Sequence, residues 1–144
     1  MSYNVELAMK YIRNKLDSEW NGINFEYELK DDACNVKGSN ITLRNHDDDI
    51  MVIITAYDGG MAYFRAVFDK CDKTMRSLER LNAFNASNIF FKAYIRNDDY
   101  LELRNVIAFY DEADLAKYAD EFLDRLAKLA DDDELQALTS LTHA

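Results

Sequence analysis

The chain has 144 residues, of which 49% are hydrophobic and 31% charged, with 17 Lys and Arg against 27 Asp and Glu. This composition is typical of a globular protein, and a chain of this length can bury about 68–70% of its unfolded surface in one domain. The formal net charge of −10 repels nucleic-acid backbones and anionic membrane surfaces. We therefore expect one domain over residues 1–144, with a core from about 3 to 130 and a short helical tail over 131–144, and neither nucleic acid nor a membrane as partner.

Hydropathy and cysteine usage bear on the cellular compartment. The sequence has no apolar run approaching the ~20 residues that span a bilayer, and its first residues lack a basic segment followed by an apolar one. We therefore expect a cytoplasmic protein. Cys34 and Cys71 lie far apart and form no C-x-x-C pair, so we expect two reduced, structural thiols.

The first elements that the pattern predicts are a helix and two strands. Apolar residues recur at helical spacing over 5–16, which predicts an amphipathic helix. Apolar and acidic residues alternate over 25–29, which predicts a strand with one buried face. Ile41 and Leu43 give a second, short strand signal.

A central hairpin and a helix follow. The apolar run 50–54 is typical of a strand covered on both faces, and the extended pattern resumes over 61–68 after a turn signal at 58–60. We expect Asp72 to cap the next helix, because short polar side chains accept hydrogen bonds from the first backbone amides of a helix. That helix is predicted to end near Asn85.

The last part of the chain predicts a second hairpin and the best helix. Alternation over 89–96 and over 100–104 indicates two strands joined by a turn at 97–99. Asp111 is expected to cap a helix whose apolar stripe runs over 115–129. The sequence as a whole predicts an α+β fold, with an antiparallel sheet of about five strands and helices packed against it in the order α-β-β-β-α-β-β-α.

Residues able to support catalysis or bind a metal are scarce. His46 lies in an acidic turn and His143 next to the last residue, where neither imidazole is expected to be held between a nucleophile and a carboxylate. The carboxylates of residues 47–49 suit calcium or magnesium, but we favour a solvated hairpin tip because consecutive turn residues seldom converge on one ion. No phosphate-binding glycine motif is present. We therefore expect no enzyme, no catalytic residue, no cofactor and no metal.

Aromatic residues in the two predicted hairpins are the functional candidates. Alternation turns some of them away from the core, and an exposed aromatic and aliphatic patch marks a protein-binding surface, unless a helix covers that face. We name Phe64, Phe90, Tyr94 and Tyr100 as candidate protein-binding residues.

The stretch 78–85, which contains Leu81-Asn82-Ala83-Phe84-Asn85, together with the strand-like runs 89–95 and 100–103, resembles the YbjN-like family. The resemblance implies the architecture of type III secretion chaperones. These are small, acidic, cytoplasmic α+β domains, often dimeric, that hold an extended segment of another protein. It also implies that Asn82 and Asn85 are structural, ending the helix and bonding the turn before Ile89, and it implies no catalytic residue.

These observations leave three hypotheses for function. The first is a non-enzymatic interaction module, chaperone-like or a regulatory adaptor, that binds a protein segment or a second copy of itself as a homodimer. The second is an acidic mimic or inhibitor of a basic or nucleic-acid-binding protein. The third is an enzyme with an unrecognised carboxylate site.

Overall fold

The computed structural model describes residues 3–20, 23–31, 33–42, 49–57, 59–129 and 132–143. The fold is α+β, as the sequence predicts. The N-terminal half begins with one helix and continues with four strands: α1 (Tyr3–Glu19), β1 (Glu26–Lys30), β2 (Ala33–Thr42), β3 (Asp49–Tyr57) and β4 (Met61–Cys71). The C-terminal half contains α2 (Met75–Ser87), β5 (Lys92–Ile95), β6 (Tyr100–Ala108), α3 (Glu112–Leu129), α4 (Asp133–Thr139) and β7 (Thr142–His143).

The strands form one antiparallel sheet in the order β1-β2-β3-β4-β6-β5, and the two-residue β7 pairs with the end of β4. The described part of the chain therefore has four strands before α2, in agreement with the four separate strand signals of the sequence, whereas the predicted order of elements counts three. The C-terminal hairpin joins the sheet through β6, so β5 lies at the edge although it comes first in the chain. This order brings β4 and β6 side by side, and the hydrogen bonds between them span about 40 residues of sequence.

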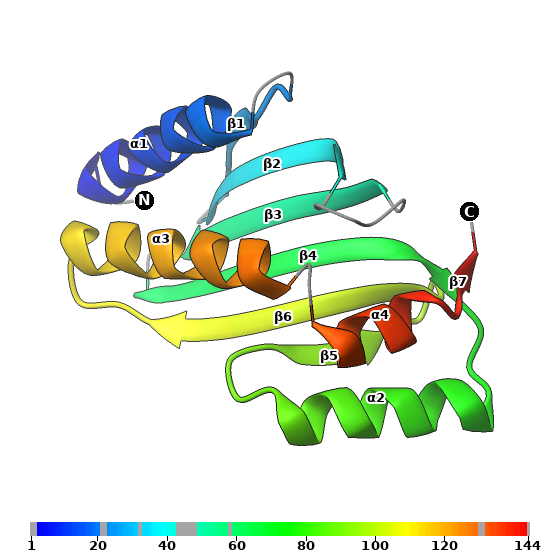
Figure 1. Ribbon diagram of the computed structural model, residues 1–144. Helices are drawn as coiled ribbons and strands as arrows, with labels where there is room; N and C mark the ends of the chain where they lie inside the picture. Colours follow the sequence, from blue (N-terminus) through cyan, green and yellow to red (C-terminus); the bar gives the residue numbers. More distant parts are fainter. Residues whose placement is uncertain are drawn as a thin grey trace.

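The helices cover one face of the sheet (Figure 1). α1 lies beside α3 and packs on β1 and β2, α3 packs on β4, and α2 lies beside β5 and α4. Phe64 of β4 stacks on Phe122 of α3 with ring centroids 5.4 Å apart, and Phe91 meets Phe122 edge to face at 5.6 Å. The core lies between these helices and the sheet, because alternation turns every second strand residue towards the helices.

The ends of α2 differ from two expectations. The N-cap is Thr74, not Asp72: Thr74 accepts from the backbone N–H of Ser77, and the Ser77 hydroxyl accepts from the backbone N–H of Thr74. This reciprocal pair satisfies two of the amides that the first turn leaves unpaired. The helix ends at Ser87, with Asn88 as C-cap, two residues beyond the predicted end.

Asn85 is structural, as the resemblance implies, but its partner differs. Its side chain bonds both backbone groups of Ala93, accepting from the N–H at 2.7 Å and donating to the C=O at 3.1 Å. Asn85 therefore ties α2 to the edge strand β5, whereas Asn88 accepts from the backbone of Phe91 in the turn. Asn82 is exposed on α2.

Candidate functional site

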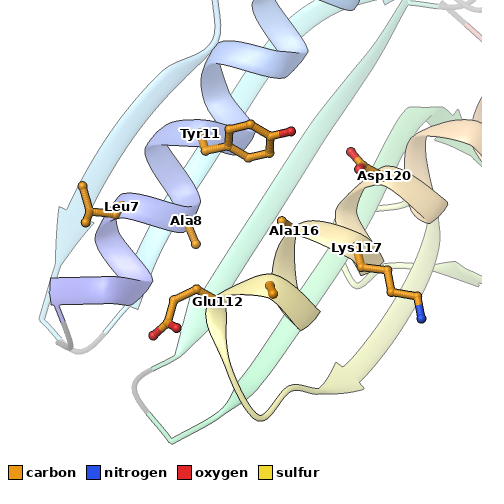
Figure 2. A pocket seen from close by; sticks show the side chains of 8 residues that line it. Leu7, Ala8, Tyr11, Glu112, Ala116, Lys117 and Asp120 are labelled. Carbon is orange, nitrogen blue, oxygen red and sulfur yellow. The ribbon is translucent and has the colours of Figure 1, made fainter.

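Two surfaces of the molecule are candidates for binding, and the first is a groove between α1 and α3 (Figure 2). It has a volume of about 790 Å³. Its lining combines small, aromatic and charged side chains: Leu7, Ala8, Tyr11, Glu112, Ala113, Ala116, Lys117 and Asp120. Lys15 of α1 forms an ion pair with Asp120 of α3, and this hydrogen bond raises the pKa of Lys15. The groove is thus a shallow channel with both signs of charge along its walls.

The second surface is the side of the sheet that faces away from the helices, which we call the open face. None of the described helices packs on it. Four large apolar side chains on it are between 40% and 47% exposed: Tyr57, Met61, Tyr94 and Val106. They lie on four strands, β3 to β6, so apolar side chains are exposed at several places across the open face.

A row of cations crosses the open face. Cross-strand register places Lys37 of β2 opposite Ile53 of β3, Ile53 opposite Arg65 of β4, Arg65 opposite Arg104 of β6, and Arg104 opposite Lys92 of β5. Directly opposite residues point to the same face, so these five residues form one line across the strands. We call Lys37, Arg65, Arg104 and Lys92 the cation row.

Tyrosine rings hold the arginines of this row in place. The guanidinium of Arg104 lies 5.1 Å from the ring centroid of Tyr63 and 4.4 Å from that of Tyr94, and Arg65 lies 5.0 Å from Tyr63. Such contacts contribute about 0.5–1 kcal/mol each at exposed sites. They also restrict the rotamers of the arginines, so less conformational entropy is lost when a ligand binds.

A buried carboxylate offsets the charge of Arg104 within this row. Glu102 is 1% exposed although it lies on the open face, because arginine side chains cover it. It accepts from Nε and Nη2 of Arg104 at 2.9 and 2.7 Å, and Arg96 lies 3.8 Å away. Arg96 also donates to Asp98 at 3.0 Å. Arg104 and Arg96 therefore have acidic partners within the fold.

Arg65 differs from these two arginines. Its Nη2 donates to the Thr55 hydroxyl at 3.2 Å, and Thr55 in turn donates to Asn35 at 2.7 Å. Its Nε is buried without a hydrogen-bond partner, and among the described residues no carboxylate forms an ion pair with it. It also lies directly opposite Arg104, an arrangement of like charges that costs free energy. Arg65 is thus a cation that Thr55 and Tyr63 hold in place, and no carboxylate of the described residues offsets its charge.

The four predicted binding residues separate in the structure. Phe64 is wrong as a surface residue: it is 0% exposed, because it lies on the covered face of β4 under Phe122. Phe90 is half-buried on the helix side, where Arg125 lies 4.7 Å from its ring centroid. Tyr94 is on the open face, and Tyr100 stands at the start of β6 with Lys70 5.6 Å from its ring centroid.

Sequence reasoning missed the residues that make the open face distinctive. Tyr63 and Arg65 alternate with Phe64, and Arg104 alternates with Leu103, so they occupied positions expected to face solvent. One signal was available: positions expected to face solvent carry the large side chains of tyrosine and arginine, which are residue types common in binding surfaces. Their gathering into one row depends on the pairing of β4 with β6, which the sequence does not reveal.

The described residues bear on the expectations about metal ligands, membrane spans and cysteines. His46 and the carboxylates of residues 47 and 48 lie outside the described residues. Over the ranges that the structure describes, no three His, Cys, Asp or Glu side chains gather as a metal site. In the same ranges, no helix is long and apolar enough to cross a membrane. Cys34 and Cys71 are both buried and free.

Comparison with known proteins returned nothing: no family model, no curated protein and no solved structure matches this chain. The resemblance to the YbjN-like family stays a prediction.

Proposed function

We propose that this protein is a non-enzymatic interaction module, chaperone-like or an adaptor, that binds a segment of another protein on its open face. The observation that carries the proposal is the contrast between the two faces of one sheet. Helices α1 and α3 pack on one face, while the other presents four half-exposed apolar side chains around arginines held by tyrosines.

The chemistry of the open face supports this proposal. Tyrosine and arginine are enriched among the residues that contribute most to protein–protein binding, because they combine a large contact area with directional polar groups. Tyr63 and Arg104 are already in mutual contact, so a partner meets a preorganised surface.

Charge argues against a second copy as the occupant of this face. In a twofold dimer the same patch meets itself, so Arg65 and Arg104 of one copy would approach those of the other. Like charges brought together at an interface cost several kcal/mol. The row is also unsuited to an acidic mimic, which must present carboxylates to its target. We therefore propose a different polypeptide as the ligand.

Selection from a peptide-display library tests the proposal. The test variant is M61S/V106S on the open face, and the matched control is M75S/L78S, which removes two exposed apolar side chains from α2. We expect peptides selected on the wild type to bind the control equally and to lose at least about tenfold in affinity for the open-face variant. Equal binding to both variants would contradict the proposal, as would failure to enrich any peptide.

A further inference from the structure

We infer that the segment bound on the open face is acidic, and that one of its carboxylates pairs with Arg65 at the centre of the cation row. The inference rests on the proposed function and adds the chemical class of the partner. Hydrophobic contact alone would not select such a segment, whereas the charges on this face do.

The first argument is the contrast between this face and the whole chain. The protein carries a formal net charge of −10, yet one line across five strands of the sheet holds Lys37, Arg65, Arg104 and Lys92, with Ile53 of β3 between the first two. Neighbouring strands lie about 4.8 Å apart, so the row extends over roughly 15–20 Å. An acidic chain lying across the strands can reach several of these cations at once.

The second argument is the unequal compensation within the row. Glu102 pairs with Arg104, and Lys92 donates to the backbone carbonyls of Asn85 and Asn88 at 2.9 and 3.0 Å. Arg65 has only the Thr55 hydroxyl and the Tyr63 ring among its described contacts. A carboxylate from a partner would offset the repulsion from Arg104 and form the charge-assisted hydrogen bonds for which a guanidinium is suited.

The third argument is a depression beside the row. It has a volume of about 480 Å³ and lies where β5 turns into β6. Its walls are Tyr94, Ile95, Arg96, Asn97, Asp98 and Arg104. Tyr94 and Ile95 are the two apolar members of a lining that is otherwise polar or charged, so the preferred segment carries one apolar side chain, such as that of tyrosine, close to its acidic ones.

A single-stranded nucleic acid is the other polyanion that binds open sheet faces, usually by stacking bases on aromatic rings. The rings of Tyr63 and Tyr94 already contact guanidinium groups, which compete with bases for the ring faces. A nucleic acid carries a phosphate at every nucleotide, so the net charge of −10 disfavours it more strongly than a peptide with only some acidic residues. The observations therefore favour an acidic peptide.

The experiment compares three probes by fluorescence anisotropy at low and high salt. They are a peptide of about 12 residues with Asp and Tyr in alternation, the same peptide with Asn in place of Asp, and a single-stranded oligouridylate of similar length. Each is titrated into the wild type, R65Q, R65K, and the control K117Q, which removes a cation from the α1/α3 groove. Thermal unfolding of each variant verifies folding.

We expect the acidic peptide to bind the wild type and K117Q equally. Its affinity should fall at least about tenfold with R65Q, less with R65K, and should weaken as salt rises. If the Asn peptide binds as well as the Asp peptide, and M61S/V106S abolishes both, the acidic inference is overturned while the proposed function stands. If neither peptide binds and display selection also fails, both are overturned. Tighter binding of the oligouridylate than of the acidic peptide would overturn the inference as well.

Discussion

The covered face and the open face of the sheet are made by the same strands, and they differ in nearly every physical respect. In β4, the side chains of Ala62, Phe64 and Ala66 point to the helices and are buried. Tyr63 and Arg65, which lie between them in the sequence, point to the open face. The covered face is held by apolar burial, and the open face by ring–guanidinium contacts and one buried carboxylate. The comparison teaches that a strand can stabilise the fold with one set of side chains and leave the other set available for recognition.

The largest effect is expected on the covered face. Phe64→Ala removes a ring from the core, where Phe122 stacks on it, and should lower the free energy of unfolding by about 3–5 kcal/mol. Its neighbour Tyr63 makes the matched control: Tyr63→Ala should cost about 1–2 kcal/mol, since it removes partly exposed cation–π contacts. Urea unfolding of both variants measures the difference. Equal losses would show that the two faces contribute alike to stability.

The next effect concerns the buried carboxylate of the open face. Glu102→Gln keeps the shape of the side chain but leaves Arg104 and Arg96 without its charge, so we expect a loss of about 1–3 kcal/mol. The arginines are about a third exposed, and water offsets part of the cost. Asp98→Asn, at an exposed ion pair, serves as control and should cost less than about 1 kcal/mol. A loss with Glu102→Gln no larger than the control would mean that Glu102 does not hold the row together.

A smaller effect is a dependence on pH that originates on the covered side. Burial raises the pKa of Cys34, and burial with a further contribution from Asp72 raises the pKa of Cys71. The folded state then retains these protons where the unfolded state has lost them, so stability is complete below the ordinary thiol pKa of about 8.5 and falls as pH rises beyond it.

Thermal unfolding between about pH 7.5 and 9.5, below the usual titration of tyrosine, follows this decline. The double variant C34A/C71A should show a flatter slope, whatever its absolute stability. An unchanged slope in that variant would assign the decline to other groups.

The smallest effect on stability, and the sharpest test of the contrast, is expected at the exposed apolar positions. Val106 is half-exposed on the open face, so Val106→Ser should change the free energy of unfolding by no more than about 0.5 kcal/mol. Leu103→Ser, three residues away on the covered face, should cost several times more. Circular dichroism during urea unfolding compares the two. A large loss with Val106→Ser would mean that the open face is a second core surface.

Local elements were predicted well, and the site only in part. The helix stripe over 115–129 corresponds to α3, and Asp111 accepts from the backbone N–H of Asp114 at its start, because both features depend on residues within a few positions of each other. Tyr94 was named as a binding residue, and alternation places it on the open face. The same prediction for Phe64 was wrong, because the alternation in β4 does not reveal which of its two faces the helices cover.

The cap of α2 shows the same limit on a local scale. Asp72 and Thr74 both have side chains that cap helices, and the choice between them depends on the reciprocal bonds of Thr74 with Ser77. A difference of two residues in where a helix begins falls within the range over which pattern alone is ambiguous. The packing of the first turn decides it.

The sequence by itself determined the periodicities that mark most helices and strands and the side chains of each strand that share a face. It missed most of β2, which begins at Ala33, well before the strand signal at Ile41. It also determined the acidic charge and the absence of a familiar catalytic motif. Only the tertiary structure decided which face the helices cover and which strands are neighbours. Lys37, Arg65 and Arg104 lie far apart in the chain, and they meet because the hydrogen-bond register between β2, β3, β4 and β6 places them on one line. Register across distant strands is set by the packing of the whole sheet, and no local pattern encodes it.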